Sequence, residues 1–229
     1  MKYEYLIFNL IVISGPLFFG ILKPFYFIKY YKEAIFSIII VAIPFIIWDA
    51  LVTNRHWFFS DEYTIGVRFF GLPFEELMFF VVVPYACLFT WEMVYRRTKD
   101  GLLNIDKLIY PIMYIFILFS ILFYFYDREY TSLASLAFGI AILFDLIFGA
   151  KIIKQKRFYY FWSWITFFTF IFNGYLTWRP IVTYDEFYQL GFRIFTIPIE
   201  DFFFGFSLLI INVSIFEKQL IIKNLRKLK

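Results

Sequence analysis

The 229-residue sequence contains one cysteine, one histidine and few charged residues. A lone cysteine, Cys87, gives no intrachain disulfide framework, and with His56 it gives no His/Cys cluster of the kind that binds zinc. Neither the glycine-rich fingerprint of dinucleotide-binding folds nor a Walker loop is present. We therefore predict no metal site and no bound cofactor.

Apolar side chains are abundant, with 62% hydrophobic residues, 26% aromatic residues, 17% charged residues and a mean hydropathy of +0.73. One globular core cannot hide this excess, so lipid must cover part of it. Seven nearly continuous apolar segments are long enough to cross a hydrocarbon layer of about 30 Å, and they favour helices over alternating barrel strands. They are 5–22, 34–53, 72–95, 108–126, 131–148, 158–178 and 197–216. The sequence predicts an all-α membrane protein of about seven transmembrane helices.

Lysine and arginine predict how the chain is inserted. Of the 22 such residues, 16 fall in the first, third and fifth loops and in the C-terminal segment, which lie on one side of the membrane. The positive-inside rule then predicts an N-out, C-in topology. The first helix lacks a small-x-small cleavage site before Lys23 and is expected to be a permanent span. The net charge of +4 reflects this topology, so no nucleic-acid partner is predicted, and the expected location is a bacterial cytoplasmic membrane.

The sequence also contains an internal duplication. The segments beginning at Trp48 and Phe172 align through the pairs Asp49/Asn173, Thr53/Thr177, Arg55/Arg179, Asp61-Glu62/Asp185-Glu186 and, after a shift of one residue, Arg68/Arg193, Pro73/Pro198, Glu75-Glu76/Glu200-Asp201 and Glu92/Glu217. The repeat predicts two three-helix units, 1–98 and 129–229, joined by a linker helix within 99–128. Together they are expected to form one membrane domain. An even offset in spans makes the repeats parallel, with a pseudo-twofold axis along the membrane normal.

Ionisable residues inside membrane spans are costly and usually functional. Here they cluster at the predicted outer ends of the helices, where a site between the two halves is expected. The predicted catalytic residues are Glu75, Glu76, Glu200 and Asp201, and the predicted supporting residues are Asp49, Arg55, Arg68, Asn173, Arg179 and Arg193. A proline followed by acidic residues is also ordinary helix-start chemistry. Two matched pairs in a duplicated frame favour a functional site.

The repeated motif P-x-E-[ED], read as GLPFEEL and TIPIEDF, carries a family resemblance. It resembles the motif of the integral-membrane, heterodimer-type lycopene cyclases, with both halves in one chain, and the resemblance extends over nearly all of the sequence. It implies that Glu75, Glu76, Glu200 and Asp201 are the essential acidic residues and that the substrate is a hydrophobic carotenoid, lycopene, in contact with membrane lipid. Asp49 opposite Asn173 departs from strict symmetry.

The resemblance implies a cofactor-independent acid–base cyclisation of lycopene end groups to β-rings. The steps are protonation, closure of a carbocation onto a nearby double bond, and deprotonation. Adjacent buried carboxyl groups suit an acid, whereas helix N-termini and arginines suit a base. One acidic pair is therefore expected to act as acid and the other as base, without an assignment of which.

Several alternatives stay open at this stage. A carotenoid hydratase or a C50 carotenoid cyclase would show similar residues, and a proton-coupled membrane transporter is the non-enzyme alternative. A retinal protein is excluded because the last predicted span, 197–216, has no lysine, and the aspartate-rich motifs of aromatic prenyltransferases are absent. One or two closed ends, the ring type and the oligomeric state are not determined by the sequence.

Overall fold

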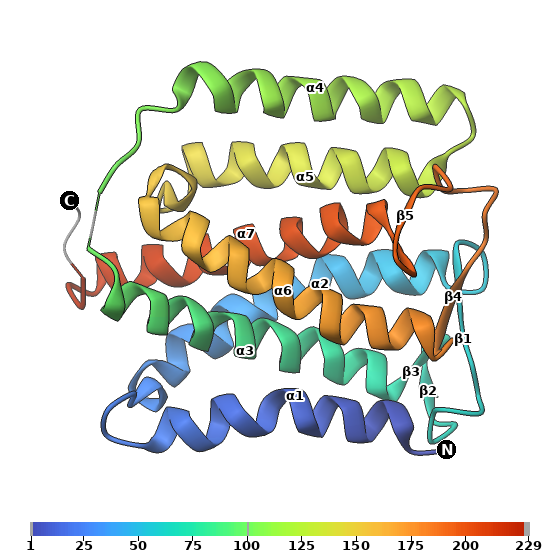
Figure 1. The fold of residues 1–229 in the computed structure, drawn as a ribbon, viewed down its shortest axis with the longest axis horizontal. Coiled ribbons are helices and arrows are strands. Elements are labelled where there is room, and N and C mark those ends of the chain that lie inside the picture. The colour runs from blue at the N-terminus through green and yellow to red at the C-terminus, as the bar shows by residue number, and fades with distance from the viewer. Residues whose placement is uncertain (1, 100, 227–229) are drawn as a thin grey trace.

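The computed structural model describes residues 2–99 and 101–226, and seven long helices run back and forth along one direction in this part of the chain (Figure 1). The helices are α1 Glu4–Ile21, α2 Tyr31–Val52, α3 Phe74–Arg97, α4 Asp106–Phe125, α5 Glu129–Ile147, α6 Lys156–Trp178 and α7 Ile199–Ile222. This confirms the all-α class. Lys227 and Lys229, which contributed to the predicted topology, and positions 1 and 100 of the predicted units lie outside the described residues.

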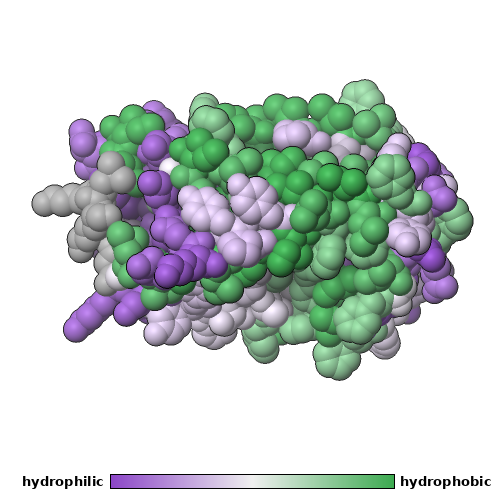
Figure 2. All heavy atoms as spheres, turned by 90° about the horizontal axis from the view of Figure 1, so that it is seen from above, coloured by the Kyte–Doolittle hydropathy of each residue, from purple (hydrophilic) through white to green (hydrophobic). Residues whose placement is uncertain are grey.

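Six of the described helices are long and apolar enough to cross a membrane. The exception is α6, whose 23 residues include several Tyr, Trp, Thr and Ser side chains that lower its hydropathy. At 1.5 Å per residue α6 is about 34 Å long, which is sufficient for a hydrocarbon layer of about 30 Å. Figure 2 shows apolar side chains across the middle of the molecule and hydrophilic ones at its two ends.

Six short strands lie at one end of the helix bundle, which we call the strand end (Figure 1). The strands are β1 Trp57–Phe59, β2 Arg68–Phe69, β3 Leu72–Pro73, β4 Val182–Tyr184, β5 Arg193–Ile194 and β6 Ile197–Pro198, in the antiparallel pairs β1–β4, β2–β3 and β5–β6. Two 3₁₀ helices, η1 Phe27–Tyr30 and η2 Ile152–Lys154, occupy the opposite end, where the loops predicted to be cytoplasmic also lie.

The same hydrogen bonds occur in both halves of the chain. The backbone N–H of Tyr5 donates to the carbonyl of Tyr63 over 3.0 Å, and the N–H of Tyr130 donates to that of Tyr188 over 2.9 Å. The β2–β3 and β5–β6 hairpins also match, because Arg68 pairs with Pro73 and Arg193 pairs with Pro198. Each proline immediately precedes an acidic helix start, of α3 or α7.

The β1–β4 pair joins the two halves and fixes how their sequences correspond. Phe58 pairs with Thr183, and around this centre Trp57 pairs with Tyr184 and Phe59 with Val182. A twofold axis through the Phe58–Thr183 pair makes residue 183 the counterpart of residue 58. Corresponding residues of the two halves are therefore 125 positions apart at β1. The one-residue shift therefore lies before β1, and the predicted alignment of Asp61-Glu62 with Asp185-Glu186 is wrong by one residue. The alignment of the two halves is fixed here by the pairing of β1 with β4. Local sequence similarity does not show this pairing.

The two halves interlock through their middle and third helices. Within the halves α1 packs on α3 and α5 on α7, and between the halves α2 packs on α7 and α3 on α6. Helix α4 lies at the edge of the bundle, mainly against α5, as Figure 1 shows. The largest cluster of buried apolar side chains runs through α3, α5, α6 and α7. A site between the halves is therefore enclosed by helices from both.

The end opposite the strands holds a second contact between the halves. The guanidinium of Arg226 binds both Glu92 of α3 and Glu217 of α7, and all three side chains are buried. The indole of Trp91 donates to Glu217 over 2.5 Å. Nearby, the carboxylate of Asp145 accepts the N–H groups of Ile152 and Ile153, each over 3.0 Å, and thereby holds η2.

Candidate active site

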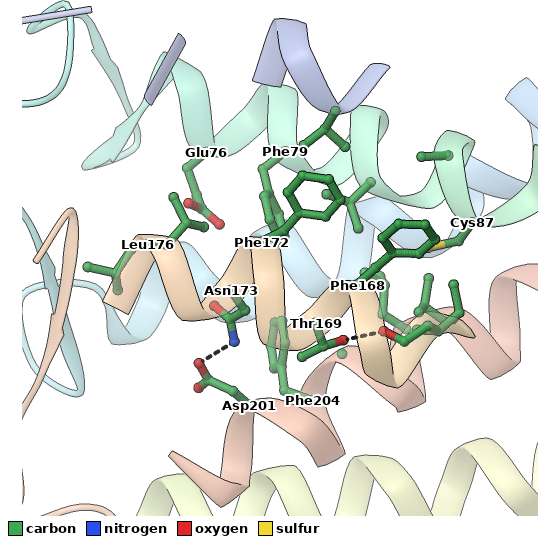
Figure 3. A pocket seen from close by; sticks show the side chains of 18 of the residues that line it. Glu76, Phe79, Cys87, Phe168, Thr169, Phe172, Asn173, Leu176, Asp201 and Phe204 are labelled. Atoms are coloured by element: carbon green, nitrogen blue, oxygen red, sulfur yellow. Dashed lines mark hydrogen bonds between the residues drawn. The ribbon is translucent and has the colours of Figure 1, made fainter. Parts of the chain in front are cut away.

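A cavity of about 470 Å³ lies between α1, α3, α6 and α7. Its walls are mostly apolar, and the rings of Phe79, Phe168, Phe172 and Phe204 surround it in Figure 3. Polar groups gather where it approaches the strand end. The acidic and amide side chains that line it are Asp49, Glu76, Asn173 and Asp201, with the first two from one half and the last two from the other.

Glu76 and Asp201 point toward each other across this end of the cavity, with Asn173 between them (Figure 3). Glu76 lies in the first turn of α3 and is 8% exposed, and its carboxyl group accepts the hydroxyl of Tyr5 over 2.5 Å. In the part of the chain that the structure describes, Tyr5 is the one recorded donor to Glu76. Asp49, 2% exposed, is among the carboxyl groups that interact electrostatically with Glu76.

Asp201, in the first turn of α7, has a much richer set of partners. Its carboxylate accepts the hydroxyls of Tyr130 and Tyr184, each over 2.6 Å, and the amide of Asn173 over 2.9 Å. Burial, with the neighbouring Asp201 carboxylate, raises the pKa of the Tyr184 hydroxyl well above its ordinary value. Tyr184 therefore stays protonated and acts as a donor. Three donors stabilise the ionised form of a carboxylate.

Asp49 is held at the end of α2 by contacts within its own half. Its carboxylate accepts the indole N–H of Trp57 over 2.6 Å and the hydroxyl of Thr53 over 3.1 Å. Because Trp57 pairs with Tyr184 across β1–β4, the same strand pair places donors beside Asp49 and Asp201. The β1–β4 pair thus provides one hydrogen-bond donor to each carboxylate, Trp57 to Asp49 and Tyr184 to Asp201.

The other two predicted acids, Glu75 and Glu200, are fully buried but do not line the cavity. Successive residues of an α-helix point about 100° apart, so only one member of each acidic pair can face the cavity. Glu75 accepts the backbone N–H of Ile65 over 2.7 Å, and Glu200 accepts that of Leu190 over 2.7 Å. Glu200 also accepts the hydroxyl of Thr131 over 2.5 Å. Both residues therefore hold the loop that precedes their helix.

The structure does not bring the four predicted arginines to the carboxyl groups of the cavity. Arg55 pairs with Glu129 over 2.5 Å, Arg68 with Asp61 over 2.6 Å, and Arg179 with Glu4 over 2.7 Å, while Arg193 donates to the carbonyl of Thr196 over 3.0 Å. All four side chains lie at the strand end, partly or largely exposed. A guanidinium is expensive to bury in an apolar cavity, and these loop positions offer acidic or carbonyl partners near water.

The sequence motifs did not predict the hydroxyl and indole donors of the site, which are Tyr5, Trp57, Tyr130 and Tyr184. A signal for two of them was present, because Tyr5 and Tyr130 are separated by the same 125 positions as Glu76 and Asp201. Tyr184 and Trp57 had no such signal, since their place depends on the pairing of β1 with β4. Among the described residues no group of three or more His, Cys, Asp or Glu side chains could hold a metal ion.

The fold and the cavity define an all-α integral membrane protein whose two related halves share one buried carboxyl site. A family model described as lycopene cyclase matches residues 2–94 and 127–218. The chain belongs to the lycopene cyclase family.

Two curated relatives are described as bifunctional lycopene cyclase/phytoene synthases. The protein of Leptosphaeria maculans is 42% identical over 59 residues, which cover 25% of this chain and 10% of the relative. The protein of Neurospora crassa is 46% identical over 39 residues, which cover 17% of this chain and 6% of the relative. The chain thus spans a small part of the length of these relatives, and no solved structure matches it. Both relatives are fungal, so the bacterial cytoplasmic membrane stays a prediction.

Proposed function

We propose that this chain closes the end groups of lycopene to β-rings inside the cavity, without a redox cofactor. The observation that carries the proposal is that Glu76 and Asp201, one from each half, face each other at the end of an apolar cavity within the membrane domain. Membership of the lycopene cyclase family supports the choice of substrate class. The reaction is an isomerisation, so the protein has only to add one proton and remove another.

Glu76 is the proposed acid. A carboxyl group that is buried, has few donors and lies near another carboxylate stays protonated more readily than one in water. Tyr5 is the one recorded donor to Glu76 among the described residues, and Asp49 is its close acidic neighbour. The proton of Glu76 adds to the terminal double bond, and the resulting cation is captured by a nearby double bond, which closes the ring.

Asp201 is the proposed base. The two tyrosine hydroxyls and the Asn173 amide favour the ionised form of its carboxylate and orient it toward the cavity. It removes a proton from the ring next to the cationic carbon, and the electron pair of that C–H bond becomes the ring double bond. Return of the proton from Asp201 to Glu76, which faces it, restores both groups for the next reaction.

The aromatic walls suit a carbocation. Phe79 and Phe204 each lie three residues after an acid, Glu76 or Asp201, and so occupy the same helix face one turn further along. Both line the cavity. The faces of such rings attract a nearby cation, and the apolar lining excludes the water that would otherwise capture it.

We further propose that the two halves, 1–98 and 129–229 with the linker 99–128, work as one unit. Glu76 and Asp49 come from the first half, and Asp201 and Asn173 from the second. Glu75 and Glu200 are positioning residues in this proposal, since each holds a loop beside the site. A half produced alone would lack either the acid or the base.

The test is expression in a lycopene-accumulating bacterium, followed by chromatography of the pigments. The wild-type chain should convert lycopene to β-ring products, and Glu76→Gln and Asp201→Asn should each lower conversion roughly 10²–10⁴-fold, the usual contribution of a positioned acid or base. The matched control is Glu75→Gln, which alters the neighbouring residue, faces away from the cavity and keeps an oxygen for the Ile65 N–H.

Three results would contradict the proposal. Unchanged pigment in cells that express the wild-type chain well would contradict the proposed cyclase activity. Hydroxylated products in place of rings would show that water captures the cation. Full activity of both Glu76→Gln and Asp201→Asn would contradict the assignment of Glu76 as acid and Asp201 as base.

A further inference from the structure

The pseudo-twofold counterpart of the cavity is filled with side chains. It lies between α2, α3 and α7, where Phe45 and Phe80 are 6% and 1% exposed. The ring centroid of Phe204 lies 5.1 Å from that of Phe45 and 4.7 Å from that of Trp48. These aromatic residues form a buried cluster at the position that corresponds to the cavity in the duplicated fold.

The residues that differ between the filled and the open side follow from the repeat. Phe80 lies four positions after Glu76, and its counterpart four positions after Asp201 is Gly205. Phe45 lies four positions before Asp49, and its counterpart four positions before Asn173 is Thr169. Gly205 and Thr169 both line the cavity. Two large rings on one side thus correspond to a hydrogen atom and a small side chain on the other.

Gly205 is not needed for close packing of helices. A Cβ added there would meet no atom of a described neighbour within 4 Å. Gly139 is the contrasting case, since a Cβ there would come within 2.8 Å of Ile117 on α4. A glycine inside a helix costs about 1 kcal/mol relative to alanine. At Gly205 no close helix contact offsets this cost. The effect of the glycine is to leave space in the cavity.

We propose that Gly205 and Thr169 are the specificity-determining residues of the site, and that the space they leave one turn inward from Asp201 and Asn173 receives the folded end group and the adjoining polyene. This inference rests on the proposed function. Gly205 sits on the same face of α7 as Asp201 and Thr169 on the same face of α6 as Asn173, so both flank the path from the acids into the membrane. The ligand class is an extended apolar polyene with at least one acyclic end.

The experiment is a size series at Gly205, made as Gly205→Ala, Gly205→Leu and Gly205→Phe, with Thr169→Phe as an independent second position. Conversion of lycopene should fall in the order of side-chain size. Gly205→Phe and Thr169→Phe should lose roughly 100-fold, the scale of rate lost when a substrate is displaced by about 1 Å. The matched control is Gly174→Ala on α6, outside the cavity lining, where the added Cβ meets Ile197 at an ordinary 3.7 Å.

A second readout separates binding from chemistry. Chains purified from lycopene-accumulating cells are compared for the lycopene that copurifies with them, measured by absorbance per mole of protein. Glu76→Gln should retain bound lycopene without turning it over, whereas Gly205→Phe and Thr169→Phe should lose it. Thermal unfolding in detergent checks that each variant is folded, and if Gly205→Phe does not accumulate, the alanine and leucine variants and Thr169→Phe decide the outcome.

The outcomes distinguish this inference from the proposed function. An inactive wild-type chain would overturn the proposed function. An active wild-type chain whose folded Gly205→Leu, Gly205→Phe and Thr169→Phe variants convert and bind lycopene normally would overturn the inference alone. Loss of conversion with bound lycopene unchanged would also overturn it, because the two residues would then not make room for the substrate.

Discussion

At the scale of single residues, the site is built from two carboxyl groups in different surroundings. The Asp201 carboxylate accepts hydrogen bonds from three side chains. Among the described residues, the Glu76 carboxyl group accepts one side-chain hydrogen bond, from Tyr5. Because carboxyl groups in a shared pocket titrate according to their surroundings, this difference separates the proposed base from the proposed acid.

This difference can be tested with Tyr184→Phe and Tyr5→Phe. A hydrogen bond to a charged group contributes about 1.5–3 kcal/mol and one between neutral groups about 0.5–1.5 kcal/mol. Tyr184→Phe should therefore slow cyclisation roughly tenfold or more, and Tyr5→Phe less. The measurement is the initial rate of ring formation in isolated membranes at equal protein. A larger effect of Tyr5→Phe would reverse the assignment of acid and base.

The sequence predicted the acidic residues of the proposed site but not the division of roles proposed for them. The repeated motif identified both acidic pairs, because their cost inside a membrane sets them apart from the surrounding apolar residues. Which member of each pair faces the cavity depends on how α3 and α7 are rotated in the bundle, and this is set by packing. The arginines were expected at the site because their charge suits carboxylates, yet acidic residues at the strand end, such as Asp61 and Glu129, pair with them instead.

At the scale of elements, each acidic helix start is connected to its loop by a buried side chain. Glu75 holds Ile65, and the Asn9 side chain of α1 donates to the carbonyl of Glu75 over 3.0 Å. Glu200 holds Leu190 in the same way in the second half. These contacts fix the loops that carry β1 and β4 toward the cavity.

Glu75→Ala tests this role. Removal of the acceptor leaves the partly buried N–H of Ile65 without this partner, which costs about 1–3 kcal/mol of folding free energy. Thermal unfolding in detergent should show a clear loss of stability, whereas Glu75→Gln should unfold close to the wild-type temperature. Asp61→Ala, on an exposed side chain of the same loop, is the control and should change little. Equal stability of Glu75→Ala and wild type would contradict a positioning role.

The helices were predicted well and the strand end poorly. Long apolar segments identify spans because each must cover the hydrocarbon layer, and all seven predicted spans overlap α1–α7. The last helix continues to Ile222, beyond the predicted end at 216, because Glu217 and Lys218 are accommodated at the end of α7. The two-residue strands have no periodicity that a sequence could display, and β1–β4 joins segments far apart in the chain.

At the scale of the whole molecule, the halves are joined at both ends, by β1–β4 and by Arg226. Arg226 lies between two buried carboxylates of different halves, Glu92 and Glu217. Removing one partner of a buried ion pair leaves an uncompensated charge and costs about 3–5 kcal/mol. This contact is therefore expected to contribute strongly to the association of the halves.

Arg226→Met should accordingly lower the unfolding temperature strongly and reduce the amount of folded chain in membranes. The matched control is Lys154→Met, which removes a lysine whose ion pair with Asp106 leaves the side chains 20% and 47% exposed and is worth about 0–1 kcal/mol. Both are compared by thermal unfolding of the purified chain. Similar stability of the two variants would show that Arg226 does not hold the halves together.

The filled counterpart of the cavity has a consequence for a substrate with two identical ends. A duplicated fold could treat both ends of a linear carotenoid at once, but Phe45 and Phe80 close the second position. Under the proposed function, each binding event would therefore close one end of the substrate. Closure of both ends would require the carotenoid to leave, reverse its direction in the bilayer and enter again, and a carotenoid with one ring would then be a free membrane species between the two turnovers.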